Sequence, residues 1–346
     1  MLPRICLILP YFGKLPPYWG GFIDSCKDNP DIDFFIVTDC LNSSVDYSSN
    51  IKVVSITWKG MRNIVAQTYS RYGIKRVCTS YPYKLCDYKP TYGVLFAEYL
   101  KNYDYWGYID CDLVFGNLTK FLKNIGIAEY DRLYSAGHLS IYRNCKEINE
   151  LFLESFKGLI EFKSVCGTSM IHNFDETVIN DYFRRKGLKY YDAGDDATFG
   201  IYCSEYKWRN ADFPSLGELF VKAIDGSTYA YIEHKDGSVE KHEVNYIHFM
   251  TKKDVTIPLG QNRPYCITRR GVLPFDEKFL SDLIKSTRSD AKTEKEFIDW
   301  QVRQFKKKTY QKIFRELKYN KFRVIVTLTR RIPTYIKYLM IVRKHK

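Results

Sequence analysis

The sequence predicts an α/β fold in which a Rossmann-like sheet is flanked by helices. In the first third of the chain, short β-rich runs alternate with helical patterns, and this order implies right-handed crossovers between parallel strands. Each run ends in polar or turn-forming residues, so the loops that follow should meet at one edge of the sheet. With 45% hydrophobic and 16% aromatic residues, a chain of 346 residues can fill a substantial core.

Four strands and two helices account for this pattern. The predicted strands cover residues 5–9, 34–37, 53–56 and 105–109. A helix is predicted between the first two strands, because apolar residues from Trp19 to Cys26 recur at i, i+3, i+4 and i+7. A second helix, from Tyr92 to Leu100, follows Pro90, a residue suited to a helix start.

The rest of the chain predicts smaller elements and a distinct C-terminal part. Between residues 116 and 217, helices such as 148–156 alternate with polar loops. Residues 228–244 have the pattern of a β-hairpin that turns at Asp236 and Gly237. We therefore expect one α/β domain of residues 1–265, followed by a basic, helical C-terminal extension of residues 266–346.

The net charge of +13 is concentrated at the C-terminus. Residues 300–346 carry 15 of the 53 Lys and Arg but one of the 40 Asp and Glu, so the remaining 38 basic and 39 acidic residues nearly cancel. Because the charge is segregated and no helix-turn-helix or zinc pattern accompanies it, we predict no nucleic acid partner. Apolar residues at helical spacing within 332–340 favour an anionic membrane surface as partner. A terminal helix packed on the body is the alternative.

Cysteine usage and hydropathy indicate a compartment. The ten cysteines form no Cys-x-x-Cys pair, which argues against a zinc ribbon or a dithiol redox site. No apolar run approaches the roughly 20 residues of a membrane span. We expect a cytoplasmic protein, attached peripherally to the inner face of the plasma membrane.

Two carboxylates one residue apart, Asp110 and Asp112, follow the strand predicted at 105–109. Acids at the carboxyl end of a strand in an α/β sheet suit a divalent metal that holds a phosphorylated ligand. Alternatively, they cap a helix or accept backbone hydrogen bonds at a strand-to-loop junction. The chain carries a second copy, Asp31 and Asp33, which precedes a strand in a turn and is predicted to face water.

Five motifs in order resemble those of the GT-A glycosyltransferases, in detail those of a family from bacterial capsule and O-antigen gene clusters. The motifs lie at residues 9–13, 84–93, 107–117, 137–144 and 246–249. The resemblance covers residues 3–260 and implies a GT-A fold, which is a Rossmann-like mixed sheet with flanking helices. It also implies a metal-dependent glycosyltransferase that moves a sugar from a nucleotide-sugar donor, a UDP-sugar, to a glycan or lipid-linked glycan acceptor of a surface polysaccharide. The alternative is a non-catalytic nucleotide-sugar-binding or assembly protein of the same fold.

The resemblance to the retaining galactosyltransferase and glycogenin group also implies a metal site. It makes Asp110, Asp112 and His248 the ligands of Mn²⁺, or of Mg²⁺, on the donor diphosphate. The alternative for His248 is a core histidine whose ring nitrogens bond to the backbone. The resemblance then places Lys252 or Lys253 to meet a phosphate.

Further contacts to the donor are predicted along the chain. By resemblance, Gly137 and His138 line the donor-sugar pocket, and the alternative for His138 is a loop histidine. Lys84 and Lys89 lie where a basic residue contacts the donor in the related group. A solvated lysine at a helix start is the alternative for Lys89.

Residues after the first two strands complete the predicted donor site. Tyr11 and Phe12 are placed to stack near the base, or belong to the core. Asp39 is placed to accept a hydrogen bond from the ribose or the base.

The predicted catalytic residues are Asp175 and Glu176. Their segment, 174–180, resembles the stretch that flanks the donor anomeric carbon in the retaining group, although two positions differ. A carboxylate there stabilises positive charge on the sugar or takes the proton of the acceptor hydroxyl. Asp192, Asp195 and Asp196 are rival carboxylates in a turn that contains glycine. The sequence leaves open whether the reaction inverts or retains configuration.

Overall fold

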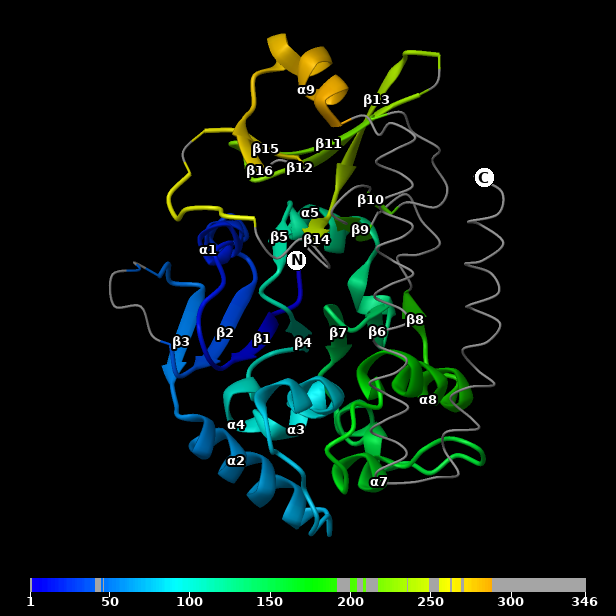
Figure 1. Ribbon diagram of the computed structural model, residues 1–346. Helices are drawn as coiled ribbons and strands as arrows, with labels where there is room; N and C mark the ends of the chain where they lie inside the picture. The colour runs from blue at the N-terminus through cyan, green and yellow to red at the C-terminus, as the bar shows by residue number, and fades with distance from the viewer. Residues whose placement is uncertain are drawn as a thin grey trace, which may run out of the picture.

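A seven-stranded mixed sheet forms the centre of the protein, in the order β3-β2-β1-β4-β7-β6-β8 (Figure 1). The computed structural model describes residues 2–40, 45, 47–191, 200–203, 208–209, 217–234, 236–248, 255–261, 263–268 and 271–287. The strands of the central sheet are β1 Ile5–Tyr11, β2 Asp33–Thr38, β3 Ile51–Ser55, β4 Tyr105–Ile109, β6 Arg132–Ala136, β7 Leu139–Arg143 and β8 Tyr190–Tyr191.

The four strands predicted in the first third are confirmed, and so is the α/β class. β1 pairs in parallel with β2 and β4, and β2 pairs in parallel with β3. β7 runs antiparallel to both β4 and β6, which makes the sheet mixed. The first four strands therefore bring their carboxyl ends to one edge of the sheet.

Helices cover both faces of the central sheet. On β1, Ile5, Leu7 and Leu9 pack in one core, and Cys6 and Ile8 pack in the other, as expected of a strand buried on both sides. The first core includes α1 Trp19–Lys27, α5 Leu118–Asn124 and η2 Ile127–Glu129. The second includes α2 Trp58–Arg71, η1 Pro82–Thr91, α3 Tyr92–Leu95, α4 Ala97–Leu100, α6 Lys146–Asn149, η3 Leu151–Leu153, α7 Phe162–Cys166, η4 Phe174–Val178 and α8 Ile179–Lys186.

Two predicted helices are shorter than expected. The helix predicted from Tyr92 to Leu100 is divided at Phe96, whose backbone leaves the helical region at φ −114° and ψ 23°. The helix predicted over 148–156 is replaced by α6 and η3, which are both shorter than five residues.

A small second sheet extends the edge beyond β4. Its order is β10-β9-β14-β5, with β5 Leu113–Phe115, β9 Gly200–Cys203, β10 Trp208–Arg209 and β14 Tyr246–His248. β14 runs antiparallel to β5, so that His248 lies opposite Leu113. This pairing brings a segment more than 130 residues away in sequence next to the loop after β4.

The third sheet is antiparallel and lies at the top of Figure 1, with the helix α9 above it. Its order is β13-β12-β11-β15-β16. The elements are β11 Gly217–Lys222, β12 Thr228–Glu233, β13 Val239–Val244, β15 Tyr265–Thr268, β16 Gly271–Pro274, η6 Glu277–Phe279 and α9 Leu280–Thr287. The predicted hairpin is confirmed as β12 and β13, and Gly237 in its turn has φ +84°.

The third sheet corrects the domain boundary predicted after residue 265. That boundary falls inside β15, which pairs with β11 and β16, so residues 266–274 belong to this sheet. The tail of residues 300–346 lies outside the described residues. Within the described ranges, no helix is long and apolar enough to cross a membrane.

Candidate functional site

A cavity of about 1020 Å³ opens at the carboxyl ends of β1 and β4. Its floor is formed by the last residues of these strands, and β14 adds a wall from the second sheet. Ten of the predicted site residues line it, namely Tyr11, Phe12, Lys89, Asp110, Asp112, Gly137, His138, Asp175, Glu176 and His248. The structure thus brings together residues from six separate parts of the chain at the edge where α/β sheets bind ligands.

Lys89 lies at the centre of the cavity wall, between two carboxylates. Its Nζ atom lies 2.6 Å from Asp110 Oδ1, donates to the Gly137 carbonyl at 2.6 Å, and lies 3.9 Å from Asp175 Oδ2. Burial lowers the pKa of Lys89, but Asp110, Cys86 and Asp175 outweigh it and raise the pKa well above its ordinary value. Lys89 is therefore a cation held inside the cavity.

Asp112 and His248 are in contact with each other and also line the cavity. The antiparallel pairing of β14 with β5 places His248 Nε2 3.4 Å from Asp112 Oδ2. The His248 ring stacks on His138 with a centroid distance of 4.0 Å and an interplanar angle of 26°. His138 Nε2 in turn lies 3.0 Å from the Tyr246 hydroxyl. Two imidazoles and a carboxylate thus form one contact group.

The donor atoms fit part of a divalent-cation site. A carboxylate and an imidazole in contact are suitable ligands for Mn²⁺, and Mg²⁺ is bound through carboxylates. In the described ranges, no group of three or more His, Cys, Asp or Glu side chains is arranged to hold a metal ion. Asp110, the third predicted ligand, is ion-paired with Lys89 instead. The chain therefore supplies Asp112 and His248 directly, while Asp110 would have to leave Lys89 to join them.

Asp175 and Glu176 line the cavity from the start of η4. Asn173, two residues before Asp175, has a left-handed backbone (φ 52°, ψ 45°), which asparagine tolerates better than most residues. The Tyr108 hydroxyl donates to the Asp175 carbonyl at 2.8 Å and anchors this turn to β4. Burial raises the pKa of the Asp175 carboxyl to about 8, although Lys89 opposes the shift.

Gly137 makes the close approach of these carboxylates possible. A Cβ atom at this position would lie 2.6 Å from Glu176 Oε1 and 2.8 Å from Asp175 Oδ2. Its carbonyl is also the acceptor for Lys89. The glycine predicted from the motif at 137–144 therefore has a steric reason to be there.

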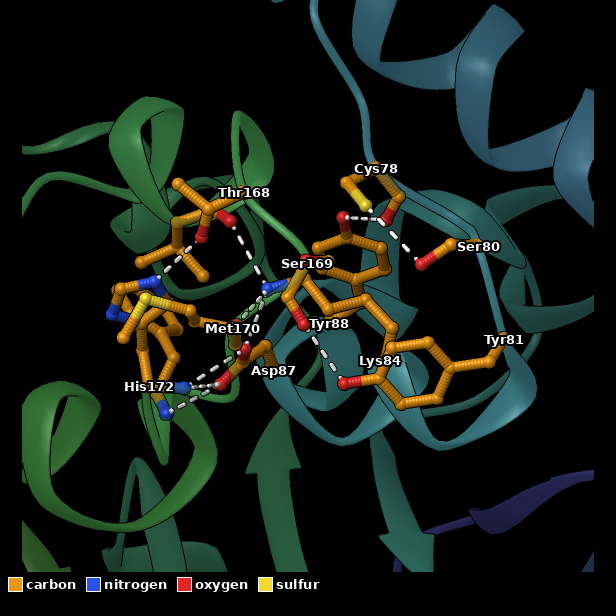
Figure 2. A network of polar contacts seen from close by, with 12 residues as sticks. Cys78, Ser80, Tyr81, Lys84, Asp87, Tyr88, Thr168, Ser169, Met170 and His172 are labelled. Carbon is orange, nitrogen blue, oxygen red and sulfur yellow. Dashed lines mark hydrogen bonds and ion pairs between the residues drawn. The ribbon is translucent and has the colours of Figure 1, made fainter. Parts of the chain in front are cut away.

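Lys84 lies away from the cavity, which corrects the prediction that it contacts the donor. Its side chain is fully buried and donates to Asp87 at 2.7 Å and to the carbonyls of Val165 and Met170 at 3.1 and 2.7 Å (Figure 2). Asp87 also accepts from the backbone amides of His172 and Phe174. This ion pair fastens the segment that leads to Asp175 onto η1, so its role is structural.

Two other predicted contacts are not found at the cavity. Asp39 does not line it; its Oδ1 accepts from the Gly13 amide at 2.9 Å and thereby holds the loop after β1. Lys252 and Lys253 lie outside the described residues, as do Asp192, Asp195 and Asp196.

Several lining residues were not predicted from the sequence. They are Tyr18, Tyr81, Tyr83, Cys86, Cys111 and Asn173. Cys111 lies between the two predicted aspartates in the sequence, so its position there could have predicted that it lines the cavity. Tyr83, Cys86 and Lys89 are spaced by three in η1, a 3-10 helix with three residues per turn, and so share one face. The sequence pattern did not reveal this period.

The model of a family of unknown function, DUF6625, matches residues 7–276. The chain belongs to this family. No curated protein sequence matches it. Among solved structures, it is similar to the galactosyltransferase LgtC in complex with donor and acceptor sugar analogs, at 12% identity and a TM-score of 0.35, over 71% of this chain and 87% of that one.

A second similar structure is the glycosyltransferase GlyE of Streptococcus pneumoniae TIGR4. The two chains share 11% identity at a TM-score of 0.30, over 57% of this chain and 47% of that one. TM-scores this low do not establish a common fold, so neither structure assigns an activity or a substrate to this family member.

Proposed function

We propose that this DUF6625 protein is a metal-dependent glycosyltransferase, which transfers a sugar from a nucleotide-sugar donor to a surface-polysaccharide acceptor. The observation that carries the proposal is the cavity itself. It combines the pair Asp112 and His248, the buried cation Lys89, and the carboxylates Asp175 and Glu176 at the carboxyl edge of an α/β sheet. Phosphate, cation and sugar each have suitable partners there.

The wall with Asp112 and His248 is the proposed metal and diphosphate end. Asp112, His248 and, once released from Lys89, Asp110 would hold Mn²⁺ or Mg²⁺. The bound cation would neutralise the charge that builds up on the leaving nucleoside diphosphate. Lys89 would then face the phosphates as a fixed positive charge inside the cavity. Tyr11 and Phe12 line the same end beside β1, where the base of a UDP-sugar would lie.

The carboxylates of η4 are the proposed sugar end. In the transfer, the acceptor oxygen bonds to the anomeric carbon, the bond from that carbon to the diphosphate oxygen breaks, and the acceptor proton must be taken up. Burial raises the pKa of Asp175 to about 8, so its carboxylate is suited to take that proton at a pH near or above 8. Glu176 is exposed beside it and is the second candidate for this role.

The location of the acceptor is part of the proposal. A lipid-linked glycan acceptor would lie at the membrane, and the +14 charge of residues 300–346 would hold the enzyme at the anionic inner surface. Each basic residue near such a surface contributes about 1 kcal/mol before screening.

The decisive experiment measures whether a nucleotide binds only with metal. Isothermal titration of UDP with and without Mn²⁺ is compared for the wild-type protein, Asp112→Asn and His248→Ala. We expect Asp112→Asn to abolish the metal-dependent part of the affinity. His248→Ala should weaken Mn²⁺ binding less, because a water molecule can occupy the vacant position.

The second Asp-x-Asp copy provides a matched control. Asp31 is exposed in a turn, lies 3.9 Å from Lys123 and does not line this cavity, so Asp31→Asn should bind UDP and Mn²⁺ as the wild type does. If Asp112→Asn retains metal-dependent UDP affinity with an unchanged melting temperature, the proposed metal site is wrong. UDP binding without turnover of any UDP-sugar would favour the non-catalytic binding protein.

A further inference from the structure

Part of the cavity lining has no role in the proposed diphosphate site, and we call this part the second end. It comprises Tyr81, Pro82, Tyr83, Leu85 and Cys86 of the η1 region, and Ile171, Asn173, Asp175 and Glu176. The volume of about 1020 Å³ is at the upper limit of ligand pockets, which span roughly 300 to 1,000 Å³. There is thus room for a second ligand beside a nucleotide sugar.

Tyr83 is the most unusual residue at this second end. It lines the cavity although 66% of its surface is exposed. This is the largest exposed fraction of any tyrosine among the described residues. It shares the cavity face of η1 with Cys86 and Lys89. An exposed aromatic ring on a cavity wall offers an apolar face of the size of one sugar ring.

The walls around Tyr83 are held rigidly. The buried Lys84–Asp87 pair ties η1 to residues 165–174, and the Tyr81 hydroxyl donates to the Ser169 carbonyl at 2.8 Å (Figure 2). The Tyr88 hydroxyl donates to the Cys78 carbonyl at 2.6 Å, which fixes the start of the same loop. The backbone that presents the ring is therefore held in place before a ligand binds.

Polar groups that suit sugar hydroxyls line the same cavity as the ring. Asn173 and Glu176 are exposed and line the cavity. An amide both donates hydrogen bonds to hydroxyls and accepts them, and a carboxylate accepts them. The cavity thus combines an aromatic face with polar groups that can bind sugar hydroxyls.

The charges at this end favour a neutral ligand. Asp110 and Glu176 both line the cavity. Among the described lining residues, Lys89 is the only lysine or arginine, and it is already bonded to Asp110. A ligand with its own carboxylate or phosphate would therefore meet no further lysine or arginine among these residues to offset its charge.

We propose that this second end binds the acceptor as a neutral sugar ring stacked on Tyr83, with its hydroxyls toward Asn173 and Glu176. The inference rests on the proposed function, which it extends by naming the acceptor class and the residue that selects it. Tyr83 here is a specificity residue, and it acts through its ring.

Saturation-transfer NMR on the full chain tests this, with Mg²⁺ and UDP present. The probes are methyl β-glycosides of glucose, galactose and N-acetylglucosamine, and methyl β-glucuronide as the charged counterpart of the glucoside. We expect saturable transfer to at least one neutral glycoside and none to the glucuronide. Tyr83→Ala should raise the Kd of that glycoside roughly tenfold or more, whereas Tyr83→Phe, which keeps the ring, should bind like the wild type.

Tyr190→Ala is the matched control, because Tyr190 is 39% exposed and does not line the cavity. The proposal is overturned if no neutral glycoside binds, if Tyr83→Ala binds it as well as the wild type does, or if the glucuronide binds equally. UDP titration on the same samples separates the two ideas. Glycoside binding at Tyr83 without metal-dependent UDP binding would reject the proposed function and retain the sugar subsite, and the converse would reject the subsite alone.

Discussion

Replacing Lys84 by methionine should strongly destabilise the protein, although Lys84 does not line the cavity. Both partners of the Lys84–Asp87 pair are fully buried, so the variant leaves an uncompensated buried charge. Breaking such a pair costs about 3 to 5 kcal/mol. Asp87 would keep its hydrogen bonds from the His172 and Phe174 amides, which favours the lower end, about 3 kcal/mol. Two carbonyls, of Val165 and Met170, also lose their donor.

Urea unfolding followed by circular dichroism measures this loss. The control is Lys101→Met, which breaks the exposed pair of Lys101 with Glu98, whose side chains are 65% and 82% exposed, and should cost at most about 0.5 kcal/mol. The double variant Lys84→Met with Asp87→Asn should be less destabilised than the sum of the single variants, because it removes both charges. A cost for Lys84→Met no larger than that for Lys101→Met would refute the reasoning.

Three further outcomes are expected. Gly137→Ala should displace the carboxylates of Asp175 and Glu176 and cost about 1 to 3 kcal/mol in urea unfolding, whereas an unchanged stability would mean that the side chains move freely. Burial raises the folded-state pKa of Asp175 from 3.8 to about 8, so its contribution favours folding at low pH and is lost as the pH rises to 8. Asp175→Asn should therefore flatten the plot of the free energy of unfolding against pH between about pH 4 and 8. An unaltered slope would exclude the pKa shift. Truncation after Trp300 should release the protein from anionic liposomes in sedimentation while UDP binding persists, and continued co-sedimentation would exclude the tail as the anchor.

The sheet could be predicted because its strands are buried on both faces. Such strands appear in the sequence as short apolar runs, and residues 5–9 and 105–109 are of this kind. The helix from 92 to 100 was predicted too long because its apolar spacing continues across Phe96, whose backbone dihedrals the spacing does not report. The boundary expected after residue 265 falls inside β15, because the pairing of β15 with β11, a strand more than 40 residues earlier, leaves no local signal in the sequence.

The site was only partly predictable. Asp110 and Asp112 follow a recognisable strand, but Asp110 contacts Lys89 whereas Asp112 contacts His248. Which partner each aspartate contacts depends on side-chain packing. The contact between Asp112 and His248 joins segments that the sequence does not connect, and it entered the prediction through resemblance alone. Asn173 could not be identified, because a left-handed backbone at a non-glycine residue leaves no reliable trace in one sequence.

The contrast between Lys84 and Lys89 shows why residue type was insufficient. Both belong to one predicted motif, and both were expected at the donor. In a 3-10 helix, residues three apart share a face, so Lys84 and Asp87 point into the core while Cys86 and Lys89 face the cavity. One element thus carries the buried pair that fixes its position and the charge that it presents to a ligand. It follows that a change on the core face should reach the cavity, and Lys84→Met should weaken UDP binding as well as folding, beyond what Lys101→Met does.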